Sequence, residues 1–367
     1  MKLSAQPAGW LLTLAICAWA HADEGMLQAP TGIQASAFTA QPPPQRLSDY
    51  NLFTNSAKQH PQAGLIPYDL ISPLHSDYSS KFRFLFIPQG HTLTYRAHEV
   101  LEFPVGSALI KTFAYPASTP LADSGNSNNR LLETRILVRL KHGWQARVYI
   151  WDSEQQEAYY KVAGKTLTID WLAINGNPDP LRYRVPNLNQ CKSCHSKDGS
   201  LVPLGPKIQN LDHPFNYRGA GFDATEQNQL QAWARLGILS DLPTEPEHAK
   251  TVDWRDANAP LEKRARAYLD SNCAHCHNPT GMASNSGLFL NLEESRSVHL
   301  GLYKRTVAAG KGTGGHTFAI VPKKPDQSII VYRMSTNQPG IFMPEIALAR
   351  PHAEGISLIT DWILSLD

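Results

Sequence analysis

The stretch Arg264–His277 reads Arg-Ala-Arg-Ala-Tyr-Leu-Asp-Ser-Asn-Cys-Ala-His-Cys-His, and it is the most informative part of the chain. Apolar residues recur at helical spacing before its first cysteine, at Leu261, Ala265, Tyr268 and Leu269. Asn258 and Pro260 suit the first turn of such a helix. The sequence therefore predicts a helix that ends in Cys273-Ala274-His275-Cys276-His277, a C-x-x-C-H motif.

The same motif occurs earlier in the chain as Cys191-Lys192-Ser193-Cys194-His195. One C-x-x-C-H could arise by chance, or be half of a zinc site or a redox dithiol. The two thiols of such a motif can add to the two vinyl groups of one porphyrin, and the histidine is then placed to bind the iron. Two copies predict two covalently attached haem c groups. The predicted thioether links are Cys191, Cys194, Cys273 and Cys276, and the predicted iron ligands are His195 and His277.

Residues 1–22 have the features of a secretory signal peptide. Lys2 supplies a single positive charge in the n-region, residues 10–19 form the apolar h-region, and Ala20-His21-Ala22 is a small-x-small cleavage site. The apolar run is too short to span a membrane. We therefore expect a periplasmic or secreted protein without a transmembrane segment in the mature chain. Export suits c-type haem, which bacteria attach outside the cytoplasmic membrane.

Cys17 raises the alternative of a lipoprotein signal. Ile16 is bulky where such signals prefer a small residue, and the apolar run continues past the cysteine, so lipid anchoring is disfavoured. Of the five cysteines, Cys17 would leave with the signal and the other four all lie in the two motifs. The net charge of +2 gives no basic field for nucleic acid, and we expect no nucleic-acid partner.

Residues 67–185 are predicted to form a β-rich domain, sandwich-like or barrel-like, after an N-terminal wrap or linker at residues 23–66. In two stretches one face of the predicted strand is mostly apolar and the residues between are more polar. The apolar face is formed by Leu132, Thr134, Ile136, Val138 and Leu140 in the first stretch, and by Ala146, Val148 and Ile150 in the second. This alternation is typical of half-buried strands, and Lys141-His142-Gly143 between the two stretches predicts a hairpin.

Residues 186–252 form the predicted first haem region. A histidine that binds iron needs a partner for its other ring nitrogen. A backbone carbonyl in the rigid Gly205-Pro206 loop could accept that bond, which makes Pro206 a candidate residue of the site. No methionine lies between His195 and the second motif. The sixth iron ligand is therefore open among His75, His213 and His248, or is absent.

Residues 253–367 follow the order of a class I cytochrome c domain. The predicted helix and motif are followed by a long loop, by Met343-Pro344, and by an amphipathic helix over 353–366. This order makes Met343 the predicted distal ligand, and a thioether opposite histidine raises the haem potential. Met334 is the rival, but it lies in a predicted short helix where buried packing is the better explanation.

Short segments over nearly the whole mature chain resemble a family of uncharacterised bacterial proteins, the conserved hypothetical family of the HNE_0200 type. They include Leu65–Leu70, Pro73–Tyr78, Phe103–Gly106, Ile110–Phe113, Glu133–Arg135, Asn189–Cys191 and Arg264–Leu269. The resemblance implies a secreted cytochrome-like protein, often encoded beside a parallel β-helix repeat protein, and it supplies no substrate. His75 stands where the family has an aromatic residue, which makes it a poor candidate for a shared iron ligand.

The sequence thus predicts an α+β protein, with an antiparallel β-rich N-terminal domain followed by mostly helical, cytochrome c-like haem domains. The leading functional prediction is a periplasmic di-haem electron-transfer protein that serves a redox partner protein. One alternative is a haem enzyme, peroxidase-like or another oxidoreductase, with an open distal position at the first haem. Another is an electron-transfer subunit whose β-rich domain docks a partner.

Overall fold

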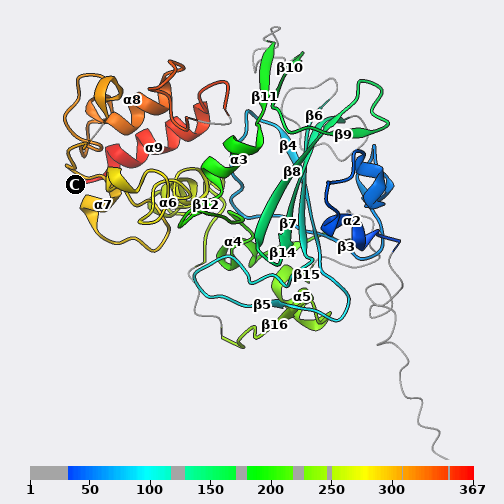
Figure 1. The fold of residues 1–367 in the computed structure, drawn as a ribbon. Helices are drawn as coiled ribbons and strands as arrows, with labels where there is room; N and C mark the ends of the chain where they lie inside the picture. The colour runs from blue at the N-terminus through cyan, green and yellow to red at the C-terminus, as the bar shows by residue number, and fades with distance from the viewer. Residues whose placement is uncertain are drawn as a thin grey trace, which may run out of the picture.

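The computed structural model describes residues 32–116, 129–170, 180–217, 227–245, 250–307, 309–345 and 348–367. The predicted signal peptide, Cys17 and His248 lie outside these residues. The fold mixes helices and strands around an antiparallel sheet, as predicted. Figure 1 shows the sheet at one side of the molecule and helices α6, α8 and α9 at the other, with α3 and β12 between them.

The central sheet has six strands in the order β3-β4-β6-β7-β8-β9, and every neighbouring pair is antiparallel. The strands are β3 (Leu65–Pro67), β4 (Ser80–Phe86), β6 (Ala108–Pro116), β7 (Asn129–Leu140), β8 (Gly143–Trp151) and β9 (Ala158–Tyr160). Leu140 pairs with Gly143, so the predicted hairpin is confirmed. β3 and β9 are the two edges, so the sheet is open and does not close into a barrel.

The N-terminal segment covers one face of this sheet. It contributes α2 (Ala35–Thr39), the 3₁₀ turn η1 (Leu47–Tyr50), β1 (Phe53–Asn55) and β2 (His60–Pro61). Phe38, Tyr50 and Leu52 pack here against Phe84 and Ile136 of the sheet. Arg147 is fully buried on the same face, where its guanidinium donates to the carbonyls of Ala37 (2.9 Å) and Ala40 (3.1 Å).

The opposite face of the sheet is also covered, which the alternating sequence pattern did not indicate. At one end, Ile208, Leu211 and Trp233 pack against Leu85 and Leu109. At the other end lies the hairpin of β10 (Lys165–Ile169) and β11 (Leu181–Val185), which packs on Phe113 and Val148. Buried and half-buried residues alternate in β7 from Thr134 to Arg139, as predicted, but Glu133 on the supposedly polar face is fully buried.

Residues 186–252 do not form a helical domain of their own in the described parts, but pack onto the sheet through their apolar side chains. Their elements are α3 (Leu188–Cys194), β12 (Ser196–Lys197), β13 (Ser200–Leu201), α4 (Ile208–Leu211), β14 (Pro214–Phe215), β15 (Gln227–Asn228), α5 (Gln229–Arg235) and β16 (Leu239–Ser240). β16 pairs in parallel with β5 (Leu93–Thr94), which belongs to the loop after β4. This pairing ties the first motif's region to the β-rich part of the chain.

The C-terminal part is built on α6 (Leu261–Asn272) and α9 (Ala353–Ser365), which agree closely with the two predicted helices. Its shorter helices are α7 (Ser297–Leu300) and α8 (Ile329–Ser335), with 3₁₀ turns at Ser284–Ser286, Gly310–Thr313 and Pro325–Gln327. Leu269, Ile359 and Trp362 form its core. Gly355 lets α9 approach α6, because a Cβ at this position would lie 2.1 Å from the Tyr268 hydroxyl.

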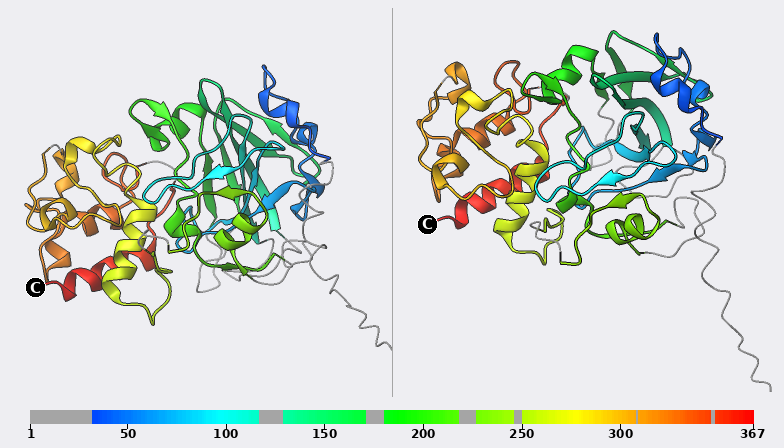
Figure 2. Two further views of the ribbon diagram at one scale, coloured as in Figure 1. Left: turned by 90° about the horizontal axis from the view of Figure 1, so that it is seen from below. Right: turned by 60° about the horizontal axis from the view of Figure 1, so that its bottom comes forward.

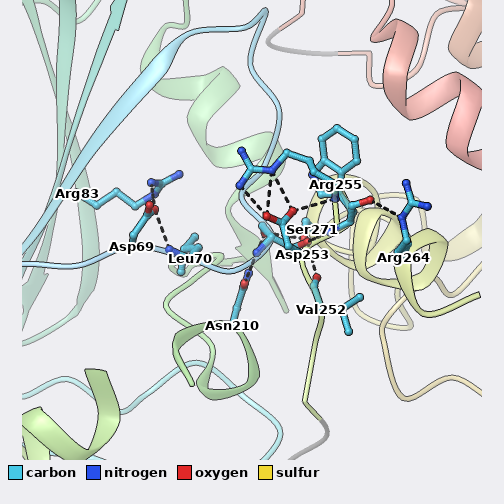
Figure 3. A network of polar contacts seen from close by, with 11 residues as sticks. Asp69, Leu70, Arg83, Asn210, Val252, Asp253, Arg255, Arg264 and Ser271 are labelled. Carbon is cyan, nitrogen blue, oxygen red and sulfur yellow. Dashed lines mark hydrogen bonds and ion pairs between the residues drawn. The ribbon is translucent and has the colours of Figure 1, made fainter. Parts of the chain in front are cut away.

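The loop between β3 and β4 joins the sheet to the C-terminal part through a polar network (Figure 3). The Ser72 hydroxyl donates to the Val252 carbonyl at 3.0 Å, and the Ser271 hydroxyl donates to the Ser72 carbonyl at 2.8 Å. Farther along the loop, the Asp77 carboxylate accepts the amides of Ala349 (2.9 Å) and Arg350 (3.3 Å), just before α9. Among the residues that the structure describes, no helix has both the length and the apolar character needed to cross a membrane.

Candidate functional site

The first motif lies at the end of α3. Asn187 caps this helix by accepting the amide of Gln190 (2.9 Å), and the Gln190 side chain accepts the amide of Asn187 in return (3.0 Å). Cys191 is 8% exposed and faces the apolar cluster under β10 and β11. After His195 the short β12–β13 hairpin reverses the chain, so that the Val202 amide donates to the His195 carbonyl at 2.8 Å.

The second motif follows α6 directly, as predicted. The amide of Cys273 still donates to the Leu269 carbonyl (2.9 Å), and the amide of His277 donates to the Cys273 carbonyl (2.9 Å). The Asn278 side chain then donates to the Ala274 carbonyl at 2.7 Å. These bonds wind the five residues of the motif into a compact turn on the end of the helix.

The two motifs meet in space. The ligand atoms of Cys194, His275 and Cys276 all lie within 4.8 Å of one another. Both views in Figure 2 show the green and yellow segments that carry the motifs between the sheet and the C-terminal helices. The fold therefore brings two widely separated parts of the chain into one site.

His195 has its ring held in one tautomer. Its Nδ1 lies 2.9 Å from the Val202 carbonyl, which can only accept, so Nδ1 carries the proton and Nε2 keeps a free lone pair. The predicted acceptor in the Gly205-Pro206 loop is wrong, because the β12–β13 hairpin brings Val202 back to the ring first. Pro206 is buried, and its carbonyl accepts the Leu101 amide at 3.3 Å.

His277 is held in the same tautomer by a different group. Its Nδ1 lies 3.1 Å from the Ser286 hydroxyl, which donates its own proton to the Ala283 carbonyl at 2.6 Å. The Ser286 oxygen must therefore accept from His277, which leaves Nε2 free. Burial lowers the pKa of both His195 and His277 to about 4, so both rings are neutral at pH 7. A neutral ring with a free Nε2 is the form that binds iron.

The two candidate methionines lie in different surroundings. Met334 is 8% exposed in the core between α6 and α9, which fits a packing role. Met343 is half-buried, and its amide donates to the Arg333 carbonyl at 3.0 Å.

The charges around Met343 also act on the second motif. Burial and then the Arg333 charge lower the pKa of His277. The interaction with Cys194 and then burial raise the pKa of Cys276, with a smaller contribution from Glu345. The loop that carries Met343 thus borders the second motif.

The described histidines proposed for the sixth position at the first motif have other neighbours. The His75 ring stacks on His352 with centroids 3.6 Å apart, and Tyr78 lies against its edge. The His213 Nε2 lies 2.9 Å from the Gln229 side chain. The histidine that does reach the first motif is His275, which the sequence analysis passed over as a spacer residue. Its Nδ1 is buried without a hydrogen-bond partner among the described residues.

A buried ion pair beside the first motif was not predicted from the sequence. Glu133 accepts two bonds from the Arg135 guanidinium, at 2.6 and 2.8 Å, and a third from the Tyr183 hydroxyl at 2.6 Å. The pKa of Cys191 is raised by burial and lowered in part by the Arg135 charge. The available signal was the alternation of Glu133 and Arg135 with apolar residues, which predicted the polar face of a half-buried strand.

No family model, curated protein or solved structure matches this chain. The two motifs and the geometry of their residues are therefore what indicates a function for the chain.

Proposed function

We propose that this chain is an exported di-haem c-type cytochrome that transfers electrons. The observation that supports it best is the meeting of two C-x-x-C-H motifs at Cys194 and Cys276. Each motif also offers a neutral histidine whose Nδ1 is already bonded and whose Nε2 is free. Histidines that bind zinc are prepared in the same way, so the two C-x-x-C-H spacings are what favour haem over zinc.

In this proposal each residue of the motifs has a defined role. Cys191 and Cys194 hold one haem, and Cys273 and Cys276 hold the other. The Nε2 atoms of His195 and His277 would bind the irons, and Met343 would supply a further ligand to the iron of the C-terminal haem. Haem supplies one-electron redox chemistry when bound. The chain's own part is to orient each imidazole, through Val202 and Ser286, and to shield the buried Cys191 thiol from water.

We extend this proposal to the C-terminal domain and to the redox partner that the sequence predicts. Residues 253–367 would form a class I cytochrome c-like domain, and a periplasmic redox partner would receive or supply the electrons. The neighbour encoded beside members of the resembling family, a parallel β-helix repeat protein, is one candidate partner. Because the two attachment motifs touch, we infer that electrons pass directly between the two haems before they leave the protein.

The deciding experiment measures haem and metal content in the protein purified from the periplasm, together with its reduced spectrum with and without carbon monoxide. Two haems and no change on adding the gas indicate a closed electron carrier. If fewer than two haems are found per chain, at least one of the two motifs does not bind haem and the di-haem proposal is contradicted. Stoichiometric zinc without haem would show that Cys194, His275 and Cys276 hold a metal ion instead.

A haem enzyme is the second candidate, and one observation favours it. His75 and His213 have other neighbours, so neither is placed at Cys194 as a distal ligand for the first haem. An open distal position would bind a peroxide or another small substrate, and the second haem would supply electrons. A carbon monoxide shift in half of the haem signal is the expected result for this candidate.

A further inference from the structure

A row of basic side chains crosses the face of the sheet that lies toward the first motif. Arg83 on β4, Lys111 on β6 and Arg135 on β7 are direct cross-strand partners, and Lys81 lies two residues from Arg83 on the same face. We call these four residues the basic row. Arg83 is 7% exposed and the other three are half-buried. Like charges directly opposite one another destabilise a sheet, and burial increases the penalty. The fold alone therefore does not explain them.

The basic row is only partly neutralised by acidic side chains. Arg83 pairs with Asp69 at 2.6 Å, and Arg135 pairs with Glu133 at 2.6 Å. The Lys81 ammonium donates to the Ser79 carbonyl at 3.1 Å. The Lys111 ammonium lies 4.9 Å from the centre of the Phe113 ring. No carboxylate of the described residues lies within ion-pair distance of either lysine.

Other acidic groups near the basic row are already occupied. Asp77 acts on Lys81 only at longer range, since its carboxylate accepts the amides of Ala349 and Arg350. Burial and the neighbouring Arg83 lower the pKa of Lys81 to about 7. This unfavourable environment for positive charge is what a bound anion would relieve.

The basic row connects a surface pocket to the first motif. At one end Lys81 and Arg83 line a pocket of about 250 Å³, together with Tyr68, Asp69 and Phe215. Figure 3 shows Arg83 extending from the sheet to Asp69 at this end. At the other end, the charges of Lys111 and Arg135 act on His195, and Arg135 also acts on Cys191 and Cys194. An anion held by the row would lie between solvent and the first motif.

We propose that the basic row is an oxyanion-binding site beside the first motif. Its ligand is a carboxylate or a small inorganic oxyanion, bound by Lys81 and Lys111 with the two arginines behind them. Two sources share this chemistry. One is a free anion that enters through the pocket. The other is a propionate of the haem at Cys191 and Cys194, and only this source rests on the proposed function.

The test uses the full-length, haem-loaded protein with sulfate as the probe and sodium chloride at matched ionic strength as the reference. Lys111→Met removes one charge from the row and keeps a long apolar side chain over Phe113. Lys165→Met, at an exposed lysine on β10, is the matched control. If the site takes a free anion, sulfate raises the melting temperature of the wild type and of Lys165→Met by about 3 °C or more, but not that of Lys111→Met.

A second protein, Cys191→Ala with Cys194→Ala, lacks the first haem and keeps the second. If propionate fills the row, sulfate stabilises this protein and not the fully loaded one, and Lys111→Met abolishes the effect. Should the double variant fail to fold, the propionate modes in the resonance Raman spectrum replace it. A shift of these modes between the loaded wild type and Lys111→Met then supports the propionate source.

The proposal is overturned if sulfate has no Lys111-dependent effect in any of these proteins and the propionate modes do not move. The visible spectrum measures the haem content independently of the sulfate effect. If the wild-type protein itself carries no haem at Cys191, the di-haem function is refuted, and a Lys111-dependent sulfate effect in that protein would still support the anion site.

Discussion

Cys194 and Cys276 belong to different C-x-x-C-H motifs, yet their sulfur atoms lie within 4.8 Å of each other. Cys194 ends α3, and Cys276 lies in the turn after α6. The contact is therefore made by tertiary structure and not by either motif alone. Under the proposed function it makes the attachment points of the two haems immediate neighbours, and it places His275 between them.

Met343→Ala should convert the second haem to a high-spin form and lower its reduction potential, because the thioether ligand is lost. The visible spectrum and a potentiometric titration measure both effects. Met334→Leu is the matched control and should leave the spectrum unchanged, since Met334 is a core residue. An unchanged spectrum in Met343→Ala would transfer the ligand role to Met334.

Ser286→Ala should raise the reduction potential of the second haem while both haems stay attached. The serine oxygen accepts the Nδ1 proton of His277, and such a bond makes the ring a stronger donor to ferric iron. Redox titration of the purified variant checks this outcome. Asn285→Ala, at the exposed neighbouring position, is the control. Equal potentials in the two variants would show that Ser286 does not tune this haem.

Acid should destabilise the protein through the stacked pair His75 and His352. Burial lowers the pKa of His75 well below its usual value, and burial lowers the pKa of His352 to about 4. Histidines in an unfolded chain take up protons near pH 6.5, so between about pH 6.5 and 4 the unfolded state binds more protons. Stability is therefore lost as the pH falls through this window.

His75→Phe keeps an aromatic ring against His352 and removes one of the two groups. Its melting temperature should fall less than that of the wild type between about pH 6.5 and 4. His142→Phe, at an exposed site in the β7–β8 turn, should follow the wild-type curve. Parallel curves for all three proteins would exclude the stacked pair as the source of the acid sensitivity.

Glu133→Ala should destabilise the fold by about 3–5 kcal/mol, because it leaves Arg135 buried without its carboxylate. The Tyr183 hydroxyl loses its acceptor at the same time. Glu102→Ala removes a carboxylate from the exposed pair with Arg96 and should cost about 0–1 kcal/mol. Denaturant unfolding of both variants measures the contrast. Similar losses would mean that the Glu133–Arg135 pair is not a buried interaction in solution.

Gly355→Ala should destabilise the C-terminal part by about 1–3 kcal/mol, because the added methyl group meets the Tyr268 ring. Ser357→Ala, at an exposed position of the same helix, should change stability by less than about 0.5 kcal/mol. Thermal unfolding followed by far-ultraviolet circular dichroism reports both. A Gly355→Ala protein as stable as Ser357→Ala would show that α6 and α9 can separate at little cost.

The local features of the fold could be predicted from the sequence. α6, α9 and the β7–β8 hairpin each depend on the spacing of apolar residues within a few turns or strand positions. The identity of the motif residues is equally local. These features need no knowledge of which distant segment packs against them.

The relationships between distant residues could not be predicted in the same way. Alternation in β7 gives the face of each side chain, but not that β11 would bring Tyr183 onto Glu133. Val202 replaced the Gly205-Pro206 loop as the partner of His195 because strands of only two residues reverse the chain, and such short strands carry no periodic signal. His275 was overlooked because its role depends on Cys194, far away in the sequence.

The burial of Cys191 and the raised pKa of Cys273, one cysteine in each motif, imply an order of events during biogenesis. Cys191 is 8% exposed, and burial raises the pKa of Cys273 to about 12. A thiol that is covered and protonated does not react readily. Under the proposed function, both porphyrins have to be joined to the chain before it folds completely. The last step would be the hydrogen bond from the Ala349 amide to Asp77, which closes the contact between the β3–β4 loop and the C-terminal part. Maturation would then be an early stage of folding in the periplasm, and a chain that closed too soon would be trapped without its prosthetic groups.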